Sequence, residues 1–401
     1  MDKKAKFKSE FSRLLRSSAN KVSLFWKGRV GLYAILKSLD IQPGDEIILP
    51  AYTCVVVPNP IIYLGARPVY VDVDPLTYNL DPEKVPAAIS PKTRVILAQN
   101  TYGLSSELDS LLEIAQENNL TVIEDCTHGL GGSYRGKPNG TIADIAFFSS
   151  QWNKPFSTGL GGMVWTRDEN VSTRLQQFED SLTPPSAAET VLLRVLYFTR
   201  EYLLHPSLYW TAVRFYRWLS QHNLIIGSSQ GTELERPEMP EDFLKGFSEF
   251  QAKIGIQALQ KFENVVKHRK KVASGLGEIL DQLGIQKPFV PEHMEHGYLK
   301  YPILVKDRAK FMEAAMEAKI ELGDWFISPI HPITQNFHLW HYQYGKYPIA
   351  EALAEHVVNL PTHPDVDEAY LSRIYDFLKT KRSLIYDSNE KCIRNHMREN
   401  V

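Results

Sequence analysis

The chain has 401 residues, a formal net charge of -2 and 43% hydrophobic residues, enough for two or three domain-sized units. No basic stripe of the kind found in nucleic-acid-binding proteins is present, which argues against a nucleic-acid partner. Cys54, Cys126 and Cys392 are far apart in the sequence, which argues against a disulfide framework and a zinc site. The basic N-terminus lacks the apolar stretch of a signal peptide, so we expect a cytoplasmic protein.

The first third of the chain alternates between helical and strand patterns. Apolar residues recur at helical spacing over 30–39, and strand patterns follow within 42–50, 63–74 and 93–100. Such alternation predicts an α/β fold with a parallel sheet that is covered by helices on both faces. Ligands of open α/β sheets bind at the carboxyl ends of the strands, and Asn100 lies at such an end.

Gly28 and Arg29 stand where the helix over 30–39 is expected to begin. A helix N-terminus attracts anions because its backbone N–H groups are unpaired and its dipole is positive there. Arg29 either binds a phosphate group with two hydrogen bonds or is an ordinary surface arginine. Both interpretations stay open.

A strand pattern over 120–125 ends in two carboxylates, Glu124 and Asp125, and His128 follows three residues later. We expect a structural role for Glu124. Asp125 lies at the end of the strand, where an acid can keep the nitrogen of a pyridinium ring protonated.

Lys154 lies between an apolar strand over 145–148 and a glycine-rich turn over 159–162. A lysine becomes a Schiff-base nucleophile when an apolar environment lowers its pKa, although most loop lysines are simply solvated. Ser149, at the end of the strand, offers a hydroxyl group to a phosphate. A lysine together with Asp125 is the pair that pyridoxal phosphate needs, so we predict this cofactor.

These motifs, in this order and spacing, resemble the DegT/StrS sugar aminotransferases, a family of fold-type I pyridoxal-phosphate (PLP) enzymes, over about 28–377. The resemblance implies a large domain with a mostly parallel sheet covered by helices and a smaller C-terminal α/β domain. The expected boundaries are 1–27 for an N-terminal segment, 28–180 for the large PLP-binding domain, 181–240 for an aromatic-rich helical insertion, 241–382 for an interdomain helix and the small domain, and 383–401 for a polar tail.

The resemblance also implies an activity. The expected enzyme moves an amino group from a donor, expected to be glutamate, to a keto group of a nucleotide-activated sugar in polysaccharide or glycoconjugate biosynthesis. Lys154 would bind the cofactor and act as general base and acid, and Asp125 would hold the proton on the ring nitrogen. His128 either flanks the ring or is an ordinary core histidine. The other predicted cofactor contacts are Asn100, Ser149, Gly28, Arg29, Tyr52 and Cys54.

Two positions depart from the family pattern. Cys54 stands where the family has an aromatic residue that stacks on the pyridoxal ring, so either Tyr52 stacks from a neighbouring position or the ring is held more loosely. Leu244 stands where the family has an asparagine that reaches the partner's phosphate across a dimer interface, and Lys245 is a candidate replacement. A homodimer with active sites at the interface is a further implication of the resemblance.

Other functions stay open beside transamination. A PLP-dependent sugar dehydratase or eliminase shares the fold, but relatives with that chemistry can have histidine where Lys154 stands. The altered Arg29, Cys54 and Leu244 positions suggest a non-catalytic PLP- or sugar-binding relative. A metal site has little support, because the close pair His338 and His341 has no carboxylate beside it. We interpret those two residues and His331 as substrate-loop or surface groups.

The stretch 189–219 is apolar and aromatic and reads as two helices broken at Pro206. Arginines interrupt every window of about twenty residues, which argues against a transmembrane span. The stretch either packs against the chain's own core or a partner subunit, or lies in a membrane interface, where aromatic residues and cations are favoured together.

Overall fold

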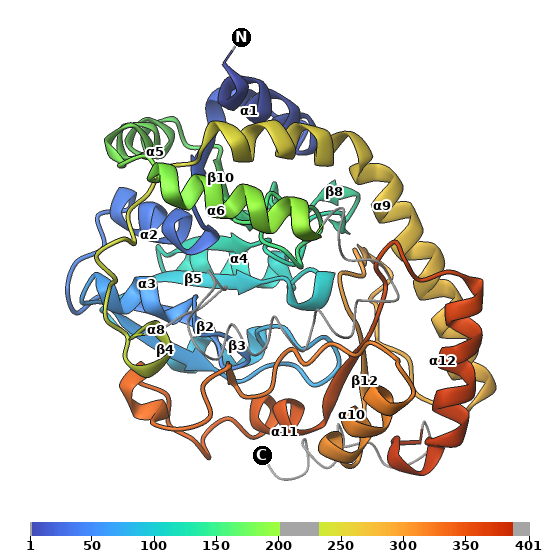
Figure 1. The fold of residues 1–401 in the computed structure, drawn as a ribbon. Coiled ribbons are helices and arrows are strands. Elements are labelled where there is room, and N and C mark those ends of the chain that lie inside the picture. The colour runs from blue at the N-terminus through green and yellow to red at the C-terminus, as the bar shows by residue number, and fades with distance from the viewer. Residues whose placement is uncertain (1, 201–231, 388–401) are drawn as a thin grey trace.

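The computed structural model describes residues 2–200 and 232–387. A seven-stranded sheet lies at the centre of the larger part of the molecule (Figure 1). In spatial order its strands are β1 (Val22–Phe25), β10 (Gly162–Thr166), β9 (Ile145–Ser149), β6 (Thr121–Asp125), β5 (Thr93–Gln99), β2 (Glu46–Pro50) and β4 (Arg67–Val71). The last five are mutually parallel, and β10 runs antiparallel to both of its neighbours. The predicted mostly parallel sheet is therefore confirmed.

Helices cover both faces of this sheet, so the strands are apolar on both sides. On one face Ile47 and Leu97 share a core with α2 (Gly28–Ser38) and α5 (Glu169–Ser181). On the other face Ile96 packs toward α4 (Leu108–Glu117). On that same face, α1 (Lys3–Leu14) lies against α9 (Glu249–Gln282) and packs on Phe148 of β9.

The 34-residue helix α9 connects the large part to a smaller C-terminal part. It begins with a capping box between Ser248 and Gln251 and is about 50 Å long. The N-terminal half packs near the central sheet, whereas Val272 and Leu280 contribute to a separate core. The other elements of the smaller part are β12 (Tyr301–Leu304), its antiparallel partner β14 (Val357–Leu360), α10 (Arg308–Glu317) and α12 (Glu368–Thr380). The predicted smaller α/β domain is thus present.

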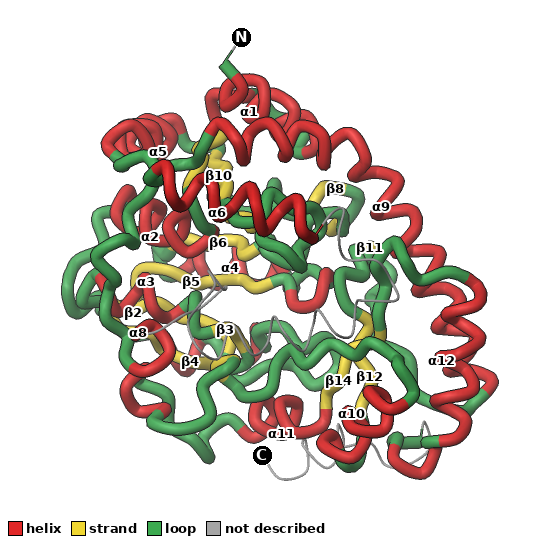
Figure 2. The backbone as a smooth tube through the Cα atoms, viewed as in Figure 1, coloured by secondary structure: helices red, strands yellow, loops and turns green. Residues whose placement is uncertain are grey.

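Shorter elements and loops surround the central sheet and the smaller part (Figure 2). They are α3 (Pro58–Tyr63), α6 (Ala187–Phe198), α8 (Thr232–Glu235), α11 (Pro348–His356), β7 (Ser133–Tyr134), β8 (Lys137–Pro138) and β11 (Met294–Glu295). One parallel pair among them, β3 (Thr53–Cys54) with β13 (Ile330–His331), lies near the predicted site.

The predicted helical stretch 189–219 is described only in its first part. Helix α6 exposes a stripe of Val191, Val195 and Phe198, each more than half exposed. Residues 201–231 lie outside the described residues, as do 388–401 of the predicted polar tail, so the choice between packing and membrane contact stays a prediction. Among the described helices, none combines the length and the apolar character that a membrane crossing requires.

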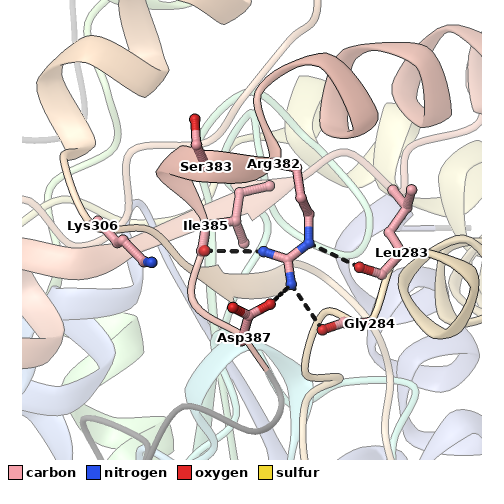
Figure 3. A pocket seen from close by; sticks show the side chains of 7 residues that line it. All are labelled: Leu283, Gly284, Lys306, Arg382, Ser383, Ile385 and Asp387. Atoms are coloured by element: carbon pink, nitrogen blue, oxygen red, sulfur yellow. Dashed lines mark hydrogen bonds and ion pairs between the residues drawn. The ribbon is translucent and has the colours of Figure 1, made fainter.

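A surface hollow of about 500 Å³ lies where the chain returns to the end of α9 (Figure 3). Arg382 lines it, and all three nitrogen atoms of its guanidinium group donate hydrogen bonds. Its guanidinium donates to the carbonyl oxygens of Leu283 at 2.8 Å, Ile385 at 3.1 Å and Gly284 at 3.0 Å, and it also pairs with Asp387. These bonds fasten the C-terminal segment to the helix end, and none of the predicted site residues lines the hollow.

Candidate active site

Parallel strands bring the predicted residues to one edge of the sheet. In the register, Asp125 at the end of β6 pairs with Gln99 of β5 and with Phe147 of β9. Lys154 follows in the connection between β9 and β10, where its backbone N–H donates to Gln151 at 3.0 Å. Gly159 closes this connection with φ +79°, and a Cβ there would lie 2.7 Å from Leu193. The turn that presents the lysine therefore requires glycine at this position.

The Lys154 side chain is half-buried and points at an aromatic ring. Its Nζ lies 4.5 Å from the centre of the Trp325 ring. Burial lowers the pKa of Lys154 to about 8, and the nearby Asp125 carboxylate opposes part of this effect. About a tenth of the amine is therefore neutral at pH 7, far more than for an ordinary lysine, and the neutral amine is the form that acts as nucleophile and base.

Asp125 is 2% exposed, and one carboxylate oxygen accepts a 2.9 Å hydrogen bond from the backbone N–H of Thr127. Burial raises the pKa of Asp125, while the Thr127 bonds and the charge of Lys154 act in the opposite direction. The result is a fixed, water-excluded carboxyl group within the field of the lysine.

His128 is also buried, at 5% exposed. Its Nδ1 accepts a 3.3 Å hydrogen bond from the backbone N–H of Tyr102, and burial holds the pKa of the imidazole well below its usual value. The ring is therefore neutral with its proton on Nε2, which leaves Nε2 as a donor. Its plane stacks on the Trp325 ring, with 4.9 Å between ring centres and 8° between planes.

The N-terminus of α2 meets the end of β9 at a close approach. A Cβ added to Gly28 would lie 3.2 Å from the Cβ of Ser149, so the absence of a side chain lets the two segments touch. The Ser149 hydroxyl and the N–H groups at the start of α2 thus lie together. A hydroxyl group beside the N–H groups of a helix N-terminus is an arrangement that can bind phosphate. With the lysine and the buried acid on the same edge, the residues present fit pyridoxal phosphate.

Arg29 is buried rather than on the surface, so the alternative of a surface arginine is wrong. Its guanidinium pairs with the Glu233 carboxylate at 2.5 Å, and the Tyr63 hydroxyl reaches the same carboxylate at 3.4 Å. The charge of Arg29 is thus already balanced, and a contact with phosphate stays a prediction.

Asn100 is fully enclosed and uses its amide within the protein. Its Nδ2 donates to Glu124 at 3.0 Å, and its Oδ1 accepts from the backbone N–H of Ser106 at 2.9 Å. Glu124 is fully buried and also accepts from the Gly140 N–H at 2.7 Å, in keeping with the structural role expected for it. A contact between Asn100 and the cofactor stays a prediction.

Tyr52 and Cys54 lie on the small-domain side of the site. The Tyr52 ring is fully buried, and its hydroxyl is bonded to the Tyr102 hydroxyl at 2.7 Å and accepts from the Phe326 N–H at 3.3 Å. Cys54 is partly exposed and pairs in register with His331. Burial raises the pKa of the Cys54 thiol, and Lys154 is among the charges acting on it. Their roles toward the pyridoxal ring stay predictions.

Sequence reasoning missed Trp325 and Lys300 and left His331 among substrate-loop or surface groups. His331 accepts from the Ile327 N–H at 3.2 Å, and burial lowers its pKa to about 4. Lys154 is among the charges that act on His331, so this histidine belongs to the surroundings of the lysine. The only sequence signal for this region was its richness in aromatic residues and proline.

Lys245, the candidate replacement for a cross-subunit asparagine, is engaged within its own chain. It pairs with Glu189 of α6 and with Asp242 at 3.1 Å. Leu244 packs, partly buried, against the core of the large part. Across residues 2–200 and 232–387 there is no group of three or more His, Cys, Asp or Glu side chains arranged to hold a metal ion.

Comparison with known proteins relates the sequence of this chain to one family. The DegT/DnrJ/EryC1/StrS aminotransferase family matches residues 2–185 and 245–379 and leaves 186–244 unmatched. The GDP-perosamine synthase of Caulobacter vibrioides is 29% identical and covers 86% of this chain and 82% of its own. The UDP-2-acetamido-2-deoxy-3-oxo-D-glucuronate aminotransferase of Pseudomonas aeruginosa is 27% identical with the same coverage.

Solved structures agree on the fold. The aminotransferase TlmJ from Streptoalloteichus hindustanus superimposes with a TM-score of 0.74 at 20% identity, over 95% of this chain and 91% of that one. The predicted resemblance is therefore confirmed, and the chain belongs to the DegT/DnrJ/EryC1/StrS aminotransferase family of pyridoxal-phosphate enzymes.

Proposed function

We propose that this aminotransferase transfers an amino group from glutamate to a keto group of a nucleotide-activated sugar. The assignment of Lys154 as the reacting group rests on one observation. Lys154 has a pKa lowered to about 8 and lies at the strand edge, where the charge of the buried Asp125 acts on it. The names of the relatives from Caulobacter vibrioides and Pseudomonas aeruginosa support a nucleotide-activated sugar as the acceptor.

Asp125 and Lys154 have separate roles in the proposed reaction. When bound, pyridoxal phosphate supplies a ring that takes up electrons from the donor's α-carbon. Asp125 holds the proton on the ring nitrogen, and because Thr127 already fixes this carboxylate, no reorganisation is needed during the reaction. Lys154 would provide the attachment point for the cofactor and, as a free amine, would take up the proton that leaves the donor's α-carbon and return it later in the reaction.

Three further groups orient the cofactor in this proposal. Ser149 and the backbone N–H groups at Gly28 bind the phosphate at the start of α2. His128 offers its Nε2 proton as a donor, because Nδ1 is occupied by the Tyr102 N–H.

The donor and the assembly state are part of the same proposal. Glutamate as the donor and a homodimer with active sites at the subunit interface rest on the likeness to the family. Light scattering of the purified protein tests the assembly, and an active monomer would contradict it.

An absorption spectrum of the purified full chain tests the function. We expect a yellow visible band with pyridoxal phosphate that decreases when glutamate is added. Lys154→Ala should lose that band while keeping its circular dichroism, because the change removes the nucleophile at a turn. Lys346→Ala is the matched control, since Lys346 is an exposed loop lysine that lies 5.9 Å from the Tyr347 ring centre. A Lys154→Ala protein with an unchanged band and unchanged turnover would refute the assignment.

A further inference from the structure

Two lysines, Lys154 and Lys300, lie close to one indole ring, that of Trp325. The Nζ of Lys300 lies 5.1 Å from the centre of the Trp325 ring, and the Nζ of Lys154 lies 4.5 Å from the same centre. The His128 ring stacks on this indole as well. Lys300 comes just before β12 and Trp325 comes from the loop before β13, so both reach the catalytic lysine from the C-terminal part of the chain.

The backbone of Trp325 is fixed from both parts of the molecule. Its carbonyl oxygen accepts from the Tyr102 hydroxyl at 2.5 Å and from the Asn359 side chain on β14. The neighbouring carbonyl of Asp324 accepts from Arg308 at 3.0 Å. Because these bonds hold the backbone, the half-buried indole forms a preorganised wall beside Lys154 rather than a loose surface group.

Lys300 is half-buried and has no ion pair with any residue of the described ranges. Burial lowers its pKa. Glu321 and Asp324 oppose this, whereas Arg269 and Arg200 reinforce it. A cation held close to a second lysine raises the free energy of the empty site, because like charges repel more strongly where water is scarce.

Arg269 adds to this positive field. It is 8% exposed and donates to the carbonyl of Leu299 at 3.2 Å and to the Thr362 hydroxyl at 2.8 Å, while its Nε has no partner among the described residues. The carboxylates that act on Lys300, Glu321 and Asp324, form no ion pair with it in the described part of the chain, so Lys300 is suited to an anion brought by a ligand.

We infer that Lys300 binds an anionic group of a substrate, a carboxylate or a phosphate, while the Trp325 ring forms the wall against which that substrate lies. This inference rests on the proposed function. The anion has two possible sources: a carboxylate of the amino-acid donor or a phosphate of the nucleotide-activated acceptor. Both substrates of a transaminase enter the same site in turn, so the experiment must separate them.

Lys300→Met removes the charge and keeps most of the side-chain length. Lys346→Met is the control, and Lys300→Arg restores a cation. In the holoenzyme we measure the glutamate concentration for half-maximal loss of the visible band, and inhibition of that reaction by UDP. For the substrate that supplies the anion, we expect Lys300→Met to need about a tenfold higher concentration for the half-maximal effect, because a hydrogen bond to a charged group is lost. Lys300→Arg should recover most of it.

A second readout does not depend on transamination. Tryptophan fluorescence of the cofactor-free full chain is titrated with glutarate and with UDP, and Trp325→Phe identifies the responding ring. Weaker binding of glutarate in Lys300→Met assigns the donor carboxylate, and weaker binding of UDP assigns the phosphate. Weaker binding of both means that the two substrates use Lys300 in turn.

Unchanged binding of both probes in Lys300→Met overturns the inference. If the wild-type holoenzyme does not react with glutamate, the proposed function fails while the fluorescence titration still decides the role of Lys300. Should Lys300→Met not fold by circular dichroism, Lys300→Gln replaces it, and the same comparison with Lys300→Arg applies.

Discussion

In the cofactor-free protein, replacement of Lys154, the proposed catalytic lysine, should stabilise the fold. Lys154 is held in a largely apolar environment against Trp325, so its protonated form is less stable there than in water. Lys154→Met keeps an unbranched side chain of similar length and removes the charge. We therefore expect this variant to unfold at a higher urea concentration than the wild type at neutral pH.

The magnitude follows from the pKa. The pKa of Lys154 falls from 10.5 to about 8 in the folded chain, so the unfolded chain binds the proton more tightly and stability rises with pH between these two values. At about 1.4 kcal/mol per pKa unit, the protonated amine costs the fold up to about 3 kcal/mol at neutral pH. Loss of the contact with the Trp325 ring offsets about 1 kcal/mol of the gain. A net stabilisation of about 2 kcal/mol remains.

Urea denaturation of the cofactor-free proteins near pH 7 and near pH 10 provides the assay. The advantage of Lys154→Met should shrink by more than half at the higher pH, because the wild-type lysine is then neutral in the folded state, while the unfolded chain, with a lysine pKa of 10.5, is still about three-quarters protonated. Lys346→Met, which removes an exposed lysine, should match the wild type at both pH values. A destabilised Lys154→Met at pH 7, or a difference that does not change with pH, would refute the reasoning.

Two further substitutions test other parts of the site. Asp125→Asn should still bind the cofactor but lose about a hundredfold or more of kcat, because an amide does not hold the ring-nitrogen proton electrostatically; near-normal turnover at saturating glutamate would remove Asp125 from its role. Glu233→Gln leaves the buried Arg29 without its counter-charge and should cost about 3 to 5 kcal/mol in urea unfolding. An unchanged unfolding midpoint would show that the pair contributes little.

The parts of the fold that were predicted correctly depend on local sequence patterns. Strand residues such as Ile47 and Ile96 are apolar on both faces, and this pattern alone indicates a parallel sheet between helices. Asp125 ends one parallel strand and Lys154 follows the end of its neighbour, so the parallel order of the strands was enough to place them on one edge. The pairing of Lys154 with Asp125 pointed to the cofactor, and the family resemblance supported it.

Contacts that depend on tertiary packing were not available from such patterns. Lys300 and Trp325 lie in loops without periodicity, and they reach Lys154 only because the smaller part packs over the strand edge. The partner of Arg29 is Glu233, which lies about two hundred residues further along the chain. A sequence pattern indicates that an arginine follows a glycine at a helix start, but it does not indicate which carboxylate neutralises that arginine.

The same packing ties the environment of the reacting amine to both parts of the chain. Tyr102 from the large part and Asn359 from the small part donate to one carbonyl oxygen, that of Trp325. The ring of this residue contacts Lys154 and stacks on His128. A shift of the small part relative to the sheet would therefore move the ring, change the burial of the amine and, because burial is the main cause of its lowered pKa, change its basicity. Correct packing of the small part is thus a condition for the chemistry proposed for the lysine, although the lysine, the acid and the helix end proposed to bind phosphate all belong to the large part.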